Sequence, residues 1–355
     1  RNCAPAGMGL LPTMRNSADV RTLFLTSCYF VFTYILWCYD EVLPQWAVLP
    51  LWLWVSWLAF VGATMTHNTM HCKVFKEYWA NKVFQMALTL TYGHPVSSYV
   101  PGHNLSHHKF TQWRRDIMRT SKMQYKWNFL NLLLFQPTVA GAVTASDFRF
   151  IRLQVALGNR FAEQVLREFA ILIVTQGFCL WLDPWRFFLY LWVPHFIAQW
   201  GIVTMNILQH DGCETSPVGE TLPNSARNFT GGMLNWFTMN NGLHCIHHLH
   251  PTTHWSQYER LHKEEVEPFN HPALNQPSMI GYIFKTFVYP GRRETFDGKP
   301  VKFPAAEVGD DEEWIEYPES IDPEKLKMTP LKVFRFLGDS VVLLGVKLVA
   351  PIYSP

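Results

Sequence analysis

Nine of the 15 histidines in this chain of 355 residues fall into three tight clusters and one isolated position. Imidazole is the commonest neutral protein ligand for zinc, copper, iron and nickel. A structural zinc site is complete with four ligands, and a catalytic zinc site needs three. Nine histidines exceed either need and suit two metal ions of higher coordination number. The nine are His67, His71, His103, His107, His108, His210, His244, His247 and His248.

The spacing within the clusters supports this interpretation. His67 and His71 are four residues apart, so they share one face of a helix and can bind the same metal. The adjacent residues His107 and His108 point to different sides, which suits two metals, and the last cluster contains a similar pair. The alternative is a set of polar core histidines held by hydrogen bonds. Three clusters of this kind favour the metal site.

Long uncharged runs separate the clusters. Apolar residues make up 48% of the chain and charged residues only 16%, below the roughly 25% usual in soluble proteins. A helix needs about 20 apolar residues to cross a bilayer. The sequence therefore predicts an all-α integral membrane protein with four transmembrane helices in two hairpins and a histidine-rich cap on one side. The predicted spans are about 22–39, 42–66, 166–183 and 187–209.

Two hairpins return the chain to the same side of the membrane, so all nine histidines can converge there. The uncharged runs 83–102 and 127–146 are also long enough to span, but a single extra crossing would separate the clusters. We therefore expect both runs to be interfacial or re-entrant. The loop from Lys109 to Lys126 carries six basic residues and one acid, Asp116. The positive-inside rule places this side in the cytoplasm, or in the matrix or stroma of an organelle.

The ends of the chain differ in character from its centre. An N-terminal segment (1–20) precedes the membrane domain (21–288), a polar, acidic segment follows (289–330), and a C-terminal amphipathic helix is predicted for 331–355. Because the chain begins with Arg, we expect a multi-pass protein of the endoplasmic reticulum, or of an organelle inner or thylakoid membrane if a transit peptide has been removed. No basic, aromatic-rich patch indicates nucleic-acid binding.

The order H-x-x-x-H, H-x-x-x-H-H and H-x-x-H-H around two membrane hairpins resembles the membrane fatty-acid desaturase/hydroxylase superfamily, over roughly residues 20–265. The resemblance extends to an Asn four residues before the isolated histidine, here Asn206 and His210. It implies a non-haem di-iron centre of the three-histidine-box type, in which the nine histidines bind directly and Asn206 reaches a metal through water. Zinc outcompetes Fe(II) at most nitrogen sites, so purified protein can carry zinc as an artefact.

The resemblance implies a fatty-acyl desaturase that acts on an acyl-lipid or acyl-CoA substrate with O₂. The alternatives are a hydroxylase or ketolase of the same superfamily acting on alkanes, sterols or carotenoids, and a non-catalytic accessory subunit of a membrane complex. Front-end desaturases have Gln in place of His244 and often carry a fused cytochrome b5 domain, of which this sequence shows no sign. We therefore expect electrons from a separate protein, ferredoxin or cytochrome b5, and membrane-complex subunits are further candidate partners.

Groups outside the nine histidines are expected to hydrogen-bond the ligand rings and so orient them. The candidates are Asp116, Asp211 and His250, which follow the histidine clusters closely in sequence. The alternative for each of them is an ordinary surface residue.

Overall fold

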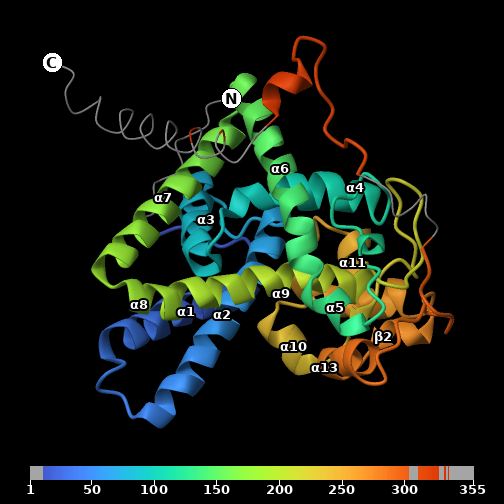
Figure 1. Ribbon diagram of the computed structural model, residues 1–355, viewed down its shortest axis with the longest axis horizontal. Helices are drawn as coiled ribbons and strands as arrows, with labels where there is room; N and C mark the ends of the chain where they lie inside the picture. The colour runs from blue at the N-terminus through green and yellow to red at the C-terminus, as the bar shows by residue number, and fades with distance from the viewer. Residues whose placement is uncertain (1–10, 304–310, 328–331, 333–334, 336–355) are drawn as a thin grey trace, which may run out of the picture.

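The computed structural model describes residues 11–303, 311–327, 332 and 335, and this part of the chain is mostly helical. Two long hairpins form its framework: α1 (Val20–Tyr39) with α2 (Gln45–His71), and α7 (Arg160–Leu182) with α9 (Val193–His210), joined through α8 (Pro184–Phe187). Figure 1 shows the hairpin turns at the left of the molecule and the histidine-bearing α4 and α11 at the right.

The remaining elements connect the hairpins or build the cap around the histidines. They are α3 (Tyr78–Tyr92), α4 (His108–Phe110), α5 (Asn128–Leu133), α6 (Phe135–Ala156), α10 (Gly232–Phe237), α11 (His244–Leu249), α12 (Tyr258–Leu261), α13 (Met279–Ile283) and the parallel two-residue strands β1 (Asn228–Phe229) and β2 (Asn275–Gln276). Turns of 3₁₀ or π type lie at Ser17–Asp19, Val96–Ser98, Val100–His107, Thr120–Lys122, Phe188–Trp192, Trp255–Gln257, His262–Val266, Pro272–Leu274, Phe284–Val288 and Pro323–Leu326.

The turns of the two hairpins lie together. Arg186, which follows the second turn, donates to Asp40 at 2.8 Å and to Glu41 at 2.7 Å in the first turn. The Tyr190 hydroxyl donates to Asp40 at 2.9 Å. Because the two turns are in contact, the two hairpins extend from them in the same direction. The histidine-bearing ends of α2 and α9 therefore meet at the end of the hairpins that lies away from the turns.

α2 is the central helix of the framework. Nearly every residue from Val55 to Asn68 is buried, as expected for a helix that is apolar on all sides. α9 packs along it, and a Cβ atom on Gly201 would lie only 2.7 Å from the Phe60 ring, so glycine permits this close approach. α2 continues beyond its apolar run as far as His71 and therefore carries both histidines of the first cluster, as predicted.

Five helices are long and apolar enough to cross a membrane, as expected for an integral membrane protein. Four of them correspond to the predicted spans, with bounds shifted by a few residues. The fifth, 128–156, covers all but the first residue of the run 127–146, which we expected to be interfacial or re-entrant. Length and composition therefore allow one crossing more than the four predicted.

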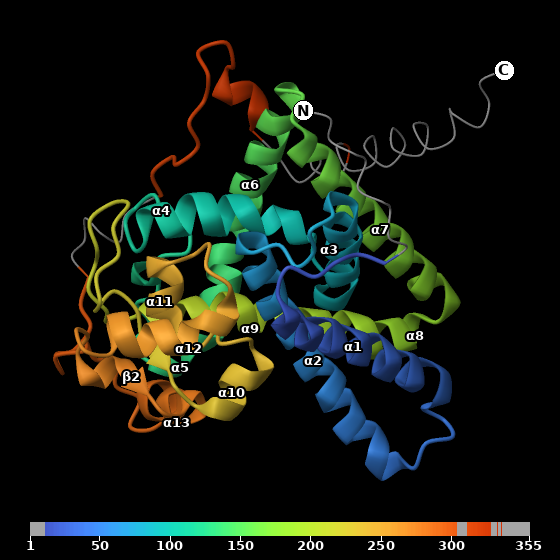
Figure 2. The same ribbon diagram turned by 180° about the vertical axis from the view of Figure 1, so that it is seen from behind.

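The surroundings of α6 favour four crossings. This helix runs across α9 in both Figure 1 and Figure 2. Near its C-terminal end, Arg149 forms an ion pair with Glu313, and Leu153 packs with Ile117 and Trp314. Residues of the loop after the second histidine cluster and of the acidic segment, both part of the cap, thus cover this half of the helix. We propose that α6 lies against the cap and that α1, α2, α7 and α9 cross the membrane.

Cysteine labelling should distinguish the two topologies. With four crossings, single cysteines at Lys126 and Leu157, before and after α6, should react from the same side of the membrane. A cysteine at Glu41, in the first hairpin turn, should react from the opposite side. A membrane-impermeant maleimide, applied to sealed and to permeabilised vesicles, shows which side of the membrane each cysteine faces. Labelling of positions 126 and 157 from opposite sides would show that α6 crosses.

The outer segments are described only in part. The C-terminal helix predicted for 331–355 lies outside the described residues except at two positions, and the N-terminal segment is described from residue 11 onward. Residues 311–327 of the acidic segment are described, and Trp314 and Ile315 within them are buried. This part of the segment is therefore packed against the protein rather than fully solvated.

Candidate metal centre

Four segments that are far apart in the sequence bring the nine histidines together. The first pair ends α2, the second cluster lies where the π-helical turn Val100–His107 meets α4, His210 ends α9, and the last cluster opens α11. All nine side chains are buried or half-buried. The hairpins thus fix the backbone positions from which the rings converge.

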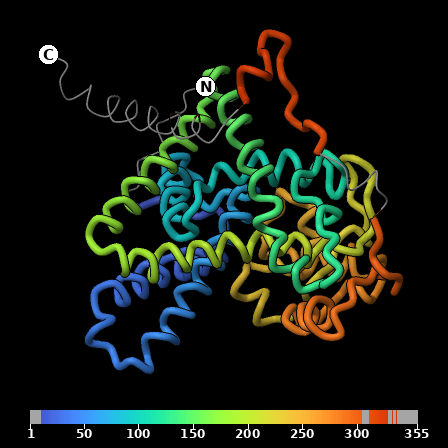
Figure 3. The backbone as a smooth tube through the Cα atoms, in the orientation of Figure 1, coloured from blue at the N-terminus to red at the C-terminus, as the bar shows by residue number. Residues whose placement is uncertain are grey.

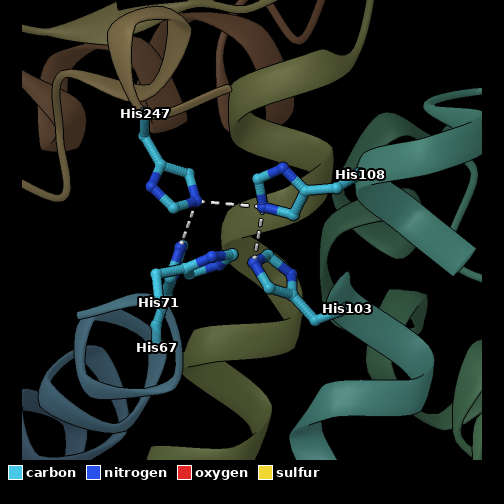
Figure 4. A group of neighbouring side chains, drawn as sticks. All are labelled: His67, His71, His103, His108 and His247. Carbon is cyan, nitrogen blue, oxygen red and sulfur yellow. Dashed lines mark hydrogen bonds between the residues drawn. The ribbon is translucent and has the colours of Figure 1, made fainter. Parts of the chain in front are cut away.

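The rings form two groups, and within each group one ring nitrogen of every member lies within 4.8 Å of the others. The two groups adjoin, since the ring centroids of His108 and His248 are 4.3 Å apart. The first group, drawn in Figure 4, is His67, His71, His103, His108 and His247. The second group is His107, His210, His244 and His248.

Histidines that are adjacent in the sequence divide between the two groups. His107 lies in the second group and His108 in the first, while His247 lies in the first and His248 in the second. Successive side chains of a helix point about 100° apart, which explains this division. The arrangement agrees with the sequence interpretation that adjacent pairs would face two metals.

The Nε2 atoms of the first group face inward. His67 Nε2 lies 2.6 Å from His247 Nε2, and His108 Nε2 lies 3.0 Å from both His103 Nε2 and His247 Nε2. Figure 4 shows these rings pointing toward one another from α2, from the second cluster and from α11. His71 Nε2 is buried and has no hydrogen-bond partner among the described residues. The nitrogens therefore surround a common point.

The second group is arranged in the same way. His244 Nε2 lies 3.0 Å from His210 Nε2 and 3.1 Å from His248 Nε2. The ring centroid of His107 is 4.8 Å from that of His210 and 5.0 Å from that of His248. Four nitrogen donors from three segments of the chain thus meet here.

The chemistry of this donor set fits a metal. Burial, together with the neighbouring histidines, lowers the pKa of five imidazoles well below its ordinary value: those of His103, His108, His244, His247 and His248. A neutral imidazole offers one unprotonated nitrogen as a ligand. Unprotonated nitrogens at these separations repel one another unless a proton or a cation lies between them. Each group can therefore hold one divalent transition metal.

Contacts on the outer side fix two of the rings. His107 Nδ1 lies 2.9 Å from the Asp116 carboxylate, and His210 Nδ1 lies 3.0 Å from the Ser225 carbonyl oxygen. Both oxygens can only accept a hydrogen bond, so each Nδ1 carries the proton and each Nε2 keeps its lone pair. Asp116 thus has the geometry expected of a group that orients a ligand ring.

Two further outer contacts were not among the sequence candidates. The Tyr258 hydroxyl lies 3.1 Å from His247 Nδ1, and the Asn241 side-chain amide lies 2.9 Å from His67 Nδ1. Asn241 belongs to the Asn-Asn-Gly-Leu-His stretch that ends at His244. Its closeness to the last histidine cluster is therefore a sequence signal that could have identified it. Nothing in the sequence marks Tyr258.

The other two candidates for outer contacts lie elsewhere. The Asp211 carboxylate binds the Arg293 guanidinium at 2.5 and 2.8 Å. His250 Nε2 lies 2.6 Å from Glu265, and the His250 side chain is 40% exposed. Within the described part of the chain, the structure brings neither Asp211 nor His250 into contact with the nine rings. Asp211 follows His210 directly, but α9 ends there and its side chain turns away.

The sequence and this geometry can be compared with known families. The model of the fatty acid desaturase family matches residues 44–276, a range that contains α2, α9, α11 and all nine histidines. The chain belongs to the fatty acid desaturase family. The resemblance inferred from the histidine pattern is therefore confirmed, and family membership makes the protein an oxidoreductase of that superfamily, whose members typically hold two irons. Comparison with curated proteins gives no match.

Asn206 lies one helical turn before His210 on α9. Its side-chain oxygen and nitrogen are both buried and have no hydrogen-bond partner among the described residues. It lines a small cavity together with His103, His107 and His244. A buried polar group without a partner costs about 1–3 kcal/mol. A metal-bound water at this position would satisfy the Asn206 amide.

The substitution Asp116→Asn should weaken metal binding by the second histidine group. Asn keeps the size of the side chain but removes the charge that holds His107 Nδ1–H, and loss of such an outer partner typically costs about 10- to 100-fold in metal affinity. Metal content after dialysis against graded chelator concentrations measures this effect. Asp297→Asn, at an exposed ion pair with Lys299, is the control and should retain metal as the parent does. Equal retention by both variants would rule out the orienting role.

Proposed function

We propose that this protein is a membrane fatty-acyl desaturase, which introduces a double bond into an acyl chain of a lipid or acyl-CoA with O₂ and external electrons at a di-iron centre. The observation that supports this most strongly is the convergence of nine buried imidazoles into two adjoining groups at the ends of long apolar helices. An all-histidine set of this size exceeds what a structural metal site needs.

The nine histidines would hold two irons, five in the first group and four in the second. Iron bound there would supply dioxygen-dependent oxidation of an unactivated C–H bond. The protein's own part is to fix the rings: Asp116 and the Ser225 carbonyl orient His107 and His210. Asn206 would hold a water beside the second group.

The cavity that Asn206 lines is small, with a volume of about 30 Å³, which suits one water molecule. Besides histidines, it is lined by the apolar side chains Ile202, Val203, Met205 and Met118 and by the polar side chains Tyr99, Gln209 and Asn241. These apolar side chains would have to move apart to admit a methylene segment beside the metal ligands. A polar head group would remain outside this cavity, at the level of the cap.

Electrons would come from a separate protein, either ferredoxin or cytochrome b5. The side of the membrane that carries the basic loop 109–126 would be the cytoplasm, or the matrix or stroma of an organelle. The membrane itself would accordingly be that of the endoplasmic reticulum or an organelle inner or thylakoid membrane.

The lipid profile of cells expressing the protein tests this function directly. Cells with the parent chain should accumulate an acyl product two hydrogens lighter than its precursor, and cells with the His107→Ala variant at equal expression should not. A product with an added oxygen would instead identify a hydroxylase or ketolase of the same superfamily. Identical profiles from both strains, with iron bound in the parent protein, would support the accessory-subunit alternative.

A further inference from the structure

An acidic segment covers the basic loop that follows the second histidine cluster. We call residues 311–316 the acidic strap and residues 109–122 the basic loop. Figure 3 shows the described segment 311–327, in red, running from the region beside α4 toward the end of α6. The ion pairs between the strap and the loop are Lys109–Glu316 (3.0 Å), Arg114–Glu312 (3.6 Å), Arg115–Glu312 (3.8 Å), Lys122–Asp311 (2.9 Å) and Arg119–Asp311.

The strap is anchored at its centre by apolar contacts. Trp314 and Ile315 are buried in a small hydrophobic cluster with Phe110, Ile117 and other side chains from the loop and α6. The Trp314 indole nitrogen donates to the Ser146 hydroxyl at 2.6 Å. The Glu312 backbone N–H also donates to the Arg114 carbonyl oxygen at 3.0 Å. The strap therefore occupies a definite site on the loop.

The ion pairs nearest the histidines are exposed and therefore weak. The Lys109 side chain is 51% exposed and Glu316 83%, while Arg115 and Glu312 are 51% and 50% exposed. Exposed ion pairs contribute little individually because water and salt screen them. The pair between Asp311 and Arg119 is different, since the Arg119 side chain is only 2% exposed. The Glu312 and Glu316 contacts can thus be displaced without loss of the anchor.

The basic loop is also the outer wall of the metal centre. Lys109 directly follows His108, and Asp116, which contacts His107, directly follows Arg115. The Trp113 indole nitrogen donates to the Ser216 carbonyl oxygen at 2.8 Å, joining the loop to the segment after α9. A protein bound to this face would lie only a few residues from members of both histidine groups.

We propose that this basic face is the docking surface for an acidic electron-carrier protein, and that the acidic strap is its intramolecular competitor. The inference rests on the proposed function, which requires a separate carrier. Charge complementarity identifies the partner, because the strap shows that acidic side chains fit Lys109, Arg114 and Arg115. A carrier binds by displacing Glu312 and Glu316, so the strap lowers its apparent affinity.

Binding of soluble cytochrome b5 and of ferredoxin to the detergent-solubilised full chain tests the inference. The strap variant is Glu312→Gln/Glu316→Gln, which removes two charges that face the loop and keeps Trp314 and Asp311. The matched control is Glu319→Gln/Asp322→Asn, which removes two charges from the same segment; neither side chain has an ion pair with the basic loop among the described residues. Thermal unfolding and metal content should be the same in both variants.

The strap variant should bind at least one carrier about three- to tenfold more tightly than the parent, as expected on release of a few exposed ion pairs. The control should bind as the parent does, and the difference should shrink at high ionic strength. Equal binding by the two variants, or no binding of either carrier to any of them, would overturn the inference. Because binding is measured without turnover, normal docking without product formation would count against the proposed reaction alone.

Discussion

Replacement of any one of the nine histidines by alanine should abolish product formation, with a loss of at least about 10²-fold. Each change removes one of the converging nitrogens of its group and leaves a bound metal with an open or displaced coordination position. His247→Ala is the most informative variant, because His247 Nε2 faces both His67 and His108. The measurement is product formed per bound iron, with a reductase and carrier supplied.

Two histidines outside the groups serve as controls. His250 contacts Glu265 and His271 is exposed, so His250→Ala and His271→Ala should retain most of the activity. If several of the nine variants instead matched the parent in product per iron, the histidines would have a structural role, and the accessory-subunit alternative would replace the enzyme.

Replacement of Arg293 by Gln should lower the free energy of unfolding by about 3–5 kcal/mol, because it leaves the buried Asp211 carboxylate without its charge partner. The side chains of Arg293 and Asp211 are only 7% and 1% exposed. Burial alone would lower the pKa of Arg293, but its interactions with Asp211 and Tyr282 together raise it. Arg293 also donates to the Met123 carbonyl oxygen at 2.6 Å, so it ties three segments of the cap together.

Chemical unfolding in detergent measures this loss, with Lys299→Gln as the matched control. Lys299 forms an exposed ion pair with Asp297 in the same segment, so its replacement should cost less than about 1 kcal/mol. The double variant Asp211→Asn/Arg293→Gln should be more stable than Arg293→Gln alone, because the Asp211 charge is removed together with the Arg293 charge. Similar small losses for Arg293→Gln and Lys299→Gln would show that the buried pair has little effect on stability.

The sequence predicted the helices that carry the histidines because their signals are local. The uncharged run that ends near His67 is long enough for a helix, and the four-residue spacing to His71 matches the helical repeat. The structure extends α2 through both residues. The same reasoning predicted that adjacent histidines would divide between two metals, in agreement with the two groups.

The membership of each group could not be predicted, since it depends on backbone geometry that the sequence does not reveal. Val100–His107 is π-helical, so the five-residue spacing from His103 to His108 places their Nε2 atoms 3.0 Å apart. An α-helix would have paired His103 with His107. The cover of the basic loop by the acidic strap was missed for a similar reason. It depends on contacts between residues separated by more than 150 positions.

The number and location of metal ions in iron-loaded protein test the central claim most directly. Metal analysis combined with anomalous diffraction at the iron edge should find two irons per chain, one within each histidine group, with His67 and His247 at one and His210 and His248 at the other. In His247→Ala the first iron should be lost or depleted while the second is retained. One metal per chain, or metals bound away from the two groups, would contradict the account.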